Sequence, residues 1–128
     1  MLETINQPDI NKAPQDLINQ LINLYHQGNY EQALKQGTKL LQQYPQAPSV
    51  HNIIGTVYSM LGQPEASVHH LRKALKLQPQ NPYSNHNLGA VLNHLEQYQE
   101  GQHFLERAIQ IKPDYADQIA LSEMEIIS

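Results

Sequence analysis

A spacing of 34 residues recurs along this chain and restricts its fold more than any other feature. Six of the eight prolines lie on one lattice of that spacing, in the series Pro14, Pro48, Pro82 and the series Pro45, Pro79, Pro113. The same shift carries Gly55 onto Gly89 and Ala74 onto Ala108. A fixed period between about 20 and 50 residues is typical of repeat proteins, in which each unit buries its apolar face against its neighbours. The chain is therefore predicted to be an array of similar units.

Within each unit, apolar residues recur at the three- and four-residue spacing of an amphipathic helix. In the second unit, Ile54 and Val57 precede a turn at Gly62, and Leu71 and Leu75 follow it. Each unit thus predicts two helices joined by a turn, and the fold class is all-α. The predicted organisation is a leader at 1–13, three repeats at 14–47, 48–81 and 82–115, and a C-terminal capping helix at 116–128. The cap is expected because the apolar face of the last pair would otherwise meet water.

The residues at matched places of the three units resemble the tetratricopeptide repeat, a helix-turn-helix unit of about 34 residues. The matching residues are Leu24, Gly28, Tyr30, Ala33 and Pro45 in the first unit, Ile54, Gly55, Tyr58, Gly62, Ala74, Leu75 and Pro79 in the second, and Leu88, Gly89, Tyr98, Ala108 and Pro113 in the third. The resemblance implies a right-handed α-solenoid of antiparallel helix pairs.

Several positions depart from the pattern of that family. The aromatic residue usual near the start of the first helix is replaced by Leu17, His51 and Asn85. The first unit also has Leu21 where the others have glycine, and Leu40 where the others have alanine. A glycine inside a helix costs about 1 kcal/mol, and we hypothesise that Gly37 makes room for one of these two leucines.

In the tetratricopeptide family the first helix of each pair lines a concave groove, so the resemblance implies a binding site there. Mapped by register, this groove is lined by Ile18, Asn19, Ile22, Tyr25, His26, Ser49, Asn52, Thr56, Ser59, Met60, Tyr83, His86, Asn87, Asn93 and His94. Most of these side chains are neutral and polar, and they offer directional hydrogen bonds without a strong electric field. Such a groove suits an extended peptide backbone or uncharged side chains.

Charge is divided unevenly between the two sets of predicted helices. Seven of the eight Lys and Arg residues fall on second helices or just after them. The first helices carry only Asp16 and, at one end, Glu96. Members of the family that bind chaperone tails clamp a terminal carboxylate with Lys and Arg in the groove. No such residue stands in the groove predicted here, so that ligand is not expected.

Composition excludes several other kinds of partner. The net charge of -4 and the scattered Lys and Arg residues provide no basic stripe for nucleic acid. The absence of cysteine removes disulfides and thiolate metal sites. No apolar run approaches the length of a membrane span, and residues 1–13 lack the apolar segment of a signal peptide. We therefore expect a cytoplasmic protein with neither a nucleic-acid nor a membrane partner.

The seven histidines raise the question of a metal or catalytic site. His26 and His94 hold the same place two repeats apart, which is too far to share one ion. His69 and His70 are adjacent, so on a helix they point about 100° apart. The sequence also lacks a Ser/His/Asp set, paired carboxylates and a phosphate-binding glycine loop. We expect no enzyme activity, no metal and no cofactor.

Three functions stay open. The first is a protein–protein interaction module that binds a peptide or protein segment in an uncharged polar groove. The second is the N-terminal substrate-recognition or scaffolding portion of a larger enzyme, since bacterial glycosyltransferases and sulfotransferases often carry such repeats ahead of a catalytic domain. The third is a homo-oligomer assembled through the C-terminal helix. That segment is rich in Ile119, Leu121, Met124, Ile126 and Ile127.

Overall fold

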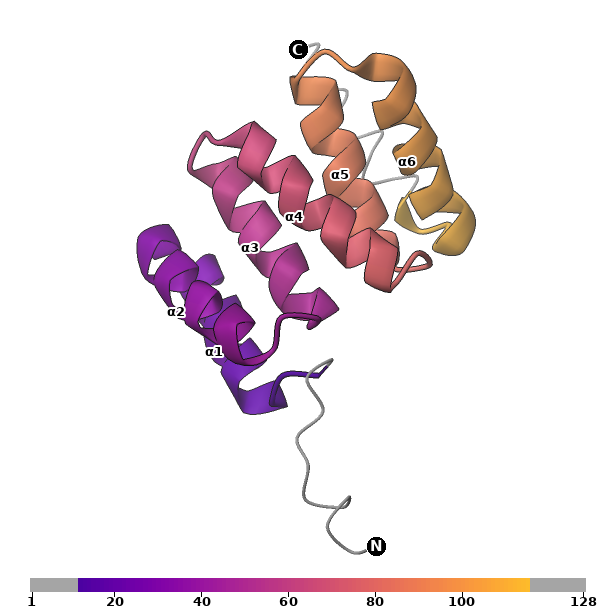
Figure 1. Cartoon of the computed structure of the whole chain (residues 1–128). Helices are drawn as coiled ribbons and strands as arrows, with labels where there is room; N and C mark the ends of the chain where they lie inside the picture. The colour runs from indigo at the N-terminus through magenta and orange to yellow at the C-terminus, as the bar shows by residue number, and fades with distance from the viewer. Residues whose placement is uncertain (1–11, 116–128) are drawn as a thin grey trace, which may run out of the picture.

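The structure is a computed structural model and describes residues 12–115. Its helices are α1 (Gln15–His26), α2 (Tyr30–Gln43), α3 (Pro48–Met60), α4 (Pro64–Leu77), α5 (Pro82–His94) and α6 (Tyr98–Ile111), shown in Figure 1. Residues 12–115 contain no strand, so the predicted all-α fold class is confirmed. The predicted capping helix at 116–128 and almost all of the predicted leader lie outside the described residues.

Proline and asparagine mark where the helices begin. Pro48 and Pro82 are the first residues of α3 and α5, a position where the missing backbone N–H costs nothing. Asn81 is the N-cap of α5. Its side-chain oxygen accepts hydrogen bonds from the backbone N–H groups of Tyr83, at 2.9 Å, and Ser84, at 3.2 Å. These bonds satisfy two donors that the first turn of a helix leaves without partners.

The turn after each first helix has the same backbone conformation in all three repeats. Gly28, Gly62 and Glu96 lie 34 residues apart, and each has a positive φ, of 78°, 75° and 64° respectively. In each turn the next residue donates its N–H to the carbonyl five positions back. These bonds join Asn29 to Leu24, Gln63 to Tyr58 and Gln97 to Leu92, each at 2.9 Å. The positive φ with this long-range bond is the glycine-type ending of a helix, which sends the chain back antiparallel.

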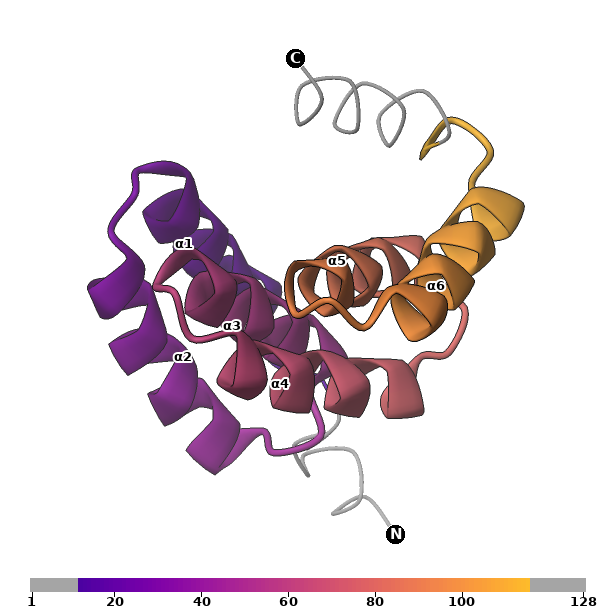
Figure 2. The ribbon, with the colours of Figure 1, turned by 90° about the horizontal axis from the view of Figure 1, so that it is seen from above.

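The stack of helices is curved. The backbones of α1 and α3, and of α3 and α5, approach within 8 Å between Cα atoms, whereas those of α2 and α4, and of α4 and α6, do not. The spacing between repeats is therefore smaller on the side of the first helices. Figure 2 shows the result from above, with α1, α3 and α5 on the inside of an arc and α2, α4 and α6 on the outside.

Small residues allow the two helices of a pair to approach closely. A Cβ atom on Gly55 would lie 2.7 Å from Cγ of Leu71. A Cβ atom on Gly89 would lie 2.7 Å from Cγ of Leu105 and 2.8 Å from the backbone oxygen of Gly101. All three distances are shorter than normal packing contacts between heavy atoms. The glycines are thus required by the crossing of α3 with α4 and of α5 with α6.

Gly37 has a related role, but its partner differs from the one expected. A Cβ atom there would lie 2.7 Å from Cγ1 of Ile54 on α3, and only at an ordinary 3.8 Å from Cδ1 of Leu21. The hypothesis that Gly37 makes room for a leucine of its own repeat is therefore wrong. Ile54 belongs to the next repeat, so this glycine sets the contact between α2 and α3 across the repeat boundary.

His51 and Asn85 replace the usual aromatic residue with a hydrogen bond to the preceding repeat. His51 is 5 % exposed, and its Nε2 donates to the carbonyl oxygen of Pro45 at 2.9 Å. Asn85 is 1 % exposed, and its amide donates to the carbonyl oxygen of Pro79 at 3.1 Å. Both prolines follow the end of a second helix, where carbonyls lack helical partners. A polar side chain therefore joins each repeat to the one before it.

Candidate peptide-binding face

All fifteen residues predicted to line the groove lie on α1, α3 and α5, the inner helices of the arc (Figure 2). We call the inner surface of these three helices the concave face. Its residues differ in how far they are available to a ligand. They form a hydrogen-bonded centre, an aromatic C-terminal end and an N-terminal end that is partly buried.

The centre of the concave face is a bridge between the second and third repeats. The side-chain amide of Asn87 on α5 donates to Oδ1 of Asn52 and to Oγ1 of Thr56, both on α3 and both at 3.2 Å. All three side chains are half-buried. Both bonds come from the Asn87 amide nitrogen, so its oxygen and the Asn52 amide nitrogen stay outside the bridge. The sequence placed these residues on one surface, and the structure brings them into contact.

The C-terminal end of the concave face is an aromatic cluster that includes two residues missed by the sequence analysis. The ring of His86 stacks on Tyr115, with centroids 5.1 Å apart and planes 13° apart. Tyr83 meets Tyr115 edge to face at 5.7 Å. The ammonium group of Lys112 donates to Oη of Tyr83 at 3.1 Å and lies 5.0 Å from the centre of its ring. Lys112 and Tyr115 follow α6, so only the folded chain brings them to α5.

Lys112 corrects the expectation that the predicted groove has no cation. Hydrogen bonding to Tyr83 raises the pKa of Lys112, so its side chain stays charged at neutral pH. Burial lowers the pKa of His86, partly opposed by the Asn87 side chain, so this ring is neutral. Burial likewise raises the pKa of Tyr115. The cluster therefore carries one positive charge, at the edge of a surface whose centre is uncharged.

The N-terminal end is more apolar and more buried than the sequence suggested. Ile18 is 8 % exposed and belongs to the core around Leu21, while Ile22 packs against the same core from a half-buried position. Ile18 still reaches a hollow of about 310 Å³, which it shares with Gln15 and Ser49. These isoleucines mainly stabilise the contact between α1 and its neighbours, and of the predicted residues at this hollow only Ser49 has a polar side chain.

The remaining predicted residues are not alike in exposure. Met60 is 52 % exposed, and His26 and His94 are also exposed. Burial raises the pKa of the half-buried Tyr25, whose ring meets that of Tyr30 on α2. Asn19 accepts a bond from the Gln15 amide at 3.0 Å. The half-buried Ser59 completes this group.

Asn93 takes part in helix packing and not in an open surface. Its Oδ1 is buried and has no hydrogen-bond partner among the described residues. A Cβ atom added to Gly101 on α6 would overlap that oxygen. Asn93 therefore fills the space that Gly101 leaves between α5 and α6. Gly101 could not be predicted from the sequence, because the other repeats have Ala33 and Ser67 at its place and no periodic signal marks it.

Neither a metal site nor a membrane span is present in the described part of the chain. Residues 12–115 contain no group of three His, Cys, Asp or Glu side chains placed to hold a metal ion. None of the helices in this range is both long and apolar enough to cross a membrane.

Two segments of the chain match a known protein family. The tetratricopeptide repeat family matches residues 48–81 and residues 70–103. The first match coincides with the pair α3 and α4, whereas the second begins within α4 and ends within α6, and so takes the repeat in a different phase. No curated protein matches the sequence.

Several solved structures share the fold. The first TPR of Spaghetti (RPAP3), solved with HSP90 peptide SRMEEVD, has a TM-score of 0.77 at 18% identity, over 94% of this chain and 100% of its own. The Sgt2 TPR domain from Aspergillus fumigatus has a TM-score of 0.76 at 18% identity, over 84% and 73% of the two chains. An O-GlcNAc transferase from Thermobaculum terrenum has a TM-score of 0.76 at 24% identity, over 79% of this chain and 19% of the transferase. The periodic helix pairs, the family matches and these neighbours agree, and the chain is a tetratricopeptide repeat protein.

Proposed function

We propose that this chain is a non-catalytic binding module that holds an extended peptide segment along the concave face. The observation that carries the proposal is the bridge from Asn87 to Asn52 and Thr56 at the centre of that face. The bridge fixes two carboxamides side by side, and each has one group outside the bridge. One of these groups is a donor, the Asn52 nitrogen, and the other is an acceptor, the Asn87 oxygen.

This donor and acceptor match the chemistry of a peptide backbone. An extended segment presents N–H and C=O groups in alternation, and one peptide unit can use both carboxamides. Because the bridge already orders the two side chains, binding costs little further side-chain entropy. The flanking aromatic cluster of Tyr83, His86 and Tyr115 adds apolar area at one end.

The electrostatics favour an uncharged segment. Asp16 is the only Asp, Glu, Lys or Arg within α1, α3 and α5, and it lies in the first turn of α1. Lys112 adds one positive charge at the opposite end of the stack. The structure of the first TPR of Spaghetti with a bound peptide supports a peptide as the class of ligand. Its identity to this chain is 18%, so the ligand itself is not carried over.

The test is a peptide-library screen with the purified chain, followed by titration of each hit against an Asn52→Ala, Asn87→Ala double variant. We expect the double variant to raise the Kd about tenfold, the effect of two hydrogen bonds of about 0.7 kcal/mol each. Circular dichroism and a urea melt establish that the variant is folded.

Gln102→Ala serves as the matched control, since Gln102 is an exposed amide on α6, on the outer side of the arc. It should leave the Kd unchanged. If a hit binds the folded double variant as tightly as the natural chain, the concave face is not its site and the proposal fails.

A second candidate is a recognition segment within a larger enzyme, which the match to the O-GlcNAc transferase favours. The similar region spans 19% of that transferase, so the repeats are a small part of it. In that case the concave face would select a protein substrate for a catalytic domain elsewhere. Sequencing the reading frame beyond residue 128 discriminates the two candidates, since a catalytic domain downstream would replace the simple binding module.

A further inference from the structure

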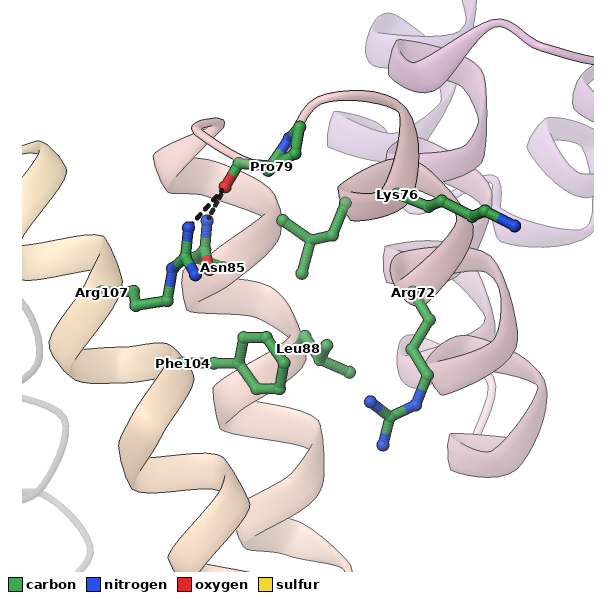
Figure 3. Close-up of a pocket in the computed structure, with 8 residues that line it drawn as sticks. Arg72, Lys76, Pro79, Asn85, Leu88, Phe104 and Arg107 are labelled. Atoms are coloured by element: carbon green, nitrogen blue, oxygen red, sulfur yellow. Dashed lines mark hydrogen bonds between the residues drawn. The ribbon is translucent and has the colours of Figure 1, made fainter.

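A pocket of about 270 Å³ opens between α4, α5 and α6, where the second helices form the outer side of the arc (Figure 3). Leu75, Leu88 and Phe104 give it an apolar floor. Arg72 and Lys76 line it from α4, with the Lys76 ammonium group directed away from the floor in Figure 3, and Arg107 lines it from α6 on the other side. This outer pocket shares no residue with the concave face.

Two residues that line the outer pocket differ from their counterparts one repeat earlier. The residues that precede Asn85 and Phe104 by 34 positions are His51 and His70. In the second repeat these two rings touch across α3 and α4, with their Nδ1 atoms 3.1 Å apart. In the third repeat the Asn85 amide turns back to the carbonyl oxygens of Pro79 and Asn81, at 3.1 and 2.8 Å. Phe104 is then left as part of the pocket floor.

Two of the three cations of the outer pocket have no charged counterpart one repeat earlier, whereas Arg107 is preceded at its place by Lys73. The residues that precede Arg72 and Lys76 by 34 positions are the uncharged Thr38 and Gln42. Lys76 is exposed and has neither an ion pair nor a hydrogen bond with another described residue. Within residues 12–115, Arg107 makes one hydrogen bond, to the carbonyl oxygen of Pro79 at 3.4 Å.

Arg72 is the one cation of the outer pocket with an ionic partner among the described residues. It contacts Glu100 at 2.7 Å, and this arginine lowers the pKa of the Glu100 carboxyl. Both side chains are more than 40 % exposed, so the pair is a solvated surface contact that another carboxylate can compete for. The outer pocket thus keeps a positive charge on both sides of its floor.

We propose that the outer pocket docks an acidic segment of a partner protein, with one large apolar side chain on the floor and flanking carboxylates at Lys76 and Arg107. The apolar floor alone would accept any hydrophobic group, and the cations alone would accept any anion. Having both within one small pocket selects a segment that carries an apolar anchor between acidic residues. This surface is separate from the proposed peptide site on the concave face, so the protein can join two partners of different charge.

The probe is the capped, fluorescein-labelled peptide Asp-Glu-Phe-Glu-Asp, titrated against the full chain by fluorescence anisotropy. Two control peptides, Asn-Gln-Phe-Gln-Asn and Asp-Glu-Ala-Glu-Asp, remove the charge and the anchor in turn. We expect each control to bind about tenfold more weakly than the probe. Lys76→Glu should weaken binding of the probe by about the same factor.

Two further variants locate the site. Lys39→Glu makes the same change of net charge on the exposed side of α2, away from the outer pocket, and should change the Kd by less than about twofold. Phe104→His introduces the residue that the second repeat has at this place. It should weaken binding of the probe, because it removes the aromatic part of the apolar floor.

Three results would overturn the proposal. Equal binding of the probe and the uncharged peptide would show that the cations select nothing. Equal weakening in Lys39→Glu and Lys76→Glu would show attraction to the overall charge and not to this pocket. The acidic peptide would lie on the concave face if the Asn52→Ala, Asn87→Ala variant bound the probe more weakly while the Lys76→Glu variant bound it as tightly as the natural chain. That last result would leave the concave-face proposal intact.

Discussion

Glu96 has a left-handed backbone conformation at a position where the other two repeats have glycine. Its φ of 64° matches those of Gly28 and Gly62, 78° and 75°. The sequence predicted a turn here from the lattice, but it could not show that the turn is left-handed, because a glutamate gives no such signal. A residue with a Cβ atom in this conformation costs about 1–2 kcal/mol. The third repeat therefore contains local strain that the first two avoid.

We predict that Glu96→Gly stabilises the protein by about 0.5–1 kcal/mol. Glycine removes the strain of the left-handed conformation from the folded state, and this gain outweighs the larger conformational entropy that glycine gives the unfolded chain. Removal of a carboxylate from the C-terminal end of α5 adds to the stability. The measurement is the urea midpoint by circular dichroism. Gln97→Gly is the control, since Gln97 has a φ of -90° and gains only unfolded-state freedom. A midpoint that falls in Glu96→Gly as it does in the control would contradict the prediction.

At the scale of elements, the pair α3 and α4 is closed by a stack of three rings. His70 lies between His51 and Tyr58, at centroid distances of 5.4 and 5.5 Å. Because the Pro45 carbonyl can only accept, Nε2 of His51 carries the hydrogen, and its Nδ1 accepts from Nδ1–H of His70. The sequence showed that His51 replaces an aromatic residue. It could not show the pairing with His70, which lies on the other helix and depends on how the two helices pack.

This stack predicts a loss of stability in mild acid. Burial, with the neighbouring His51, lowers the pKa of His70 to about 4, and burial also lowers the pKa of His51. As the pH falls from 6.5 towards 4, the unfolded chain binds protons that the folded stack does not, so the free energy of unfolding decreases. We expect a decrease on the order of 1 kcal/mol between pH 7 and pH 5, after allowance for partial exposure.

The measurement is the urea midpoint at pH 7, 6 and 5. His51→Asn is the matched variant, since Asn85 has this role in the third repeat without a titrating group. It should be less stable at pH 7 yet less dependent on pH, with a residual slope from His86, whose pKa burial also lowers. An unchanged slope in His51→Asn would exclude the stack as the cause.

At the scale of the whole molecule, the 34-residue lattice accounts for most of what the sequence could predict. It placed six helices, their turns and the fifteen residues on α1, α3 and α5, because all of these repeat with the period. It could not place Lys112 and Tyr115 beside Tyr83. These two residues lie 29 and 32 positions after Tyr83, and the contact has no counterpart in the other repeats. It also could not show the outer pocket, which exists where one repeat differs from the one before it.

Tyr115 also ends the described stack, and its removal should destabilise the whole array. It is 5 % exposed and forms a core with Leu105 and Ala108 at the end of the third repeat. We expect Tyr115→Ala to cost about 3 kcal/mol, as for other buried aromatic residues. Tyr98→Ala is the control, because Tyr98 is 61 % exposed and should change stability by less than about 1 kcal/mol. Similar urea midpoints for the two variants would show that Tyr115 does not stabilise the stack.

The outer helices of the second and third repeats are held apart from one another by the curvature of the arc. No Cα atom of α4 approaches one of α6 within 8 Å, and a solvated ion pair, Arg72 with Glu100, spans the two. A change in the angle between the second and third repeats would therefore pivot on the inner helices and alter the outer pocket, which Leu75 lines from α4 and Phe104 from α6. A segment seated in the outer pocket would link α4 to α6 and stiffen that hinge. Because the bridge from Asn87 to Asn52 crosses the same hinge on the inside, occupancy of either surface would alter the affinity of the other by the same factor.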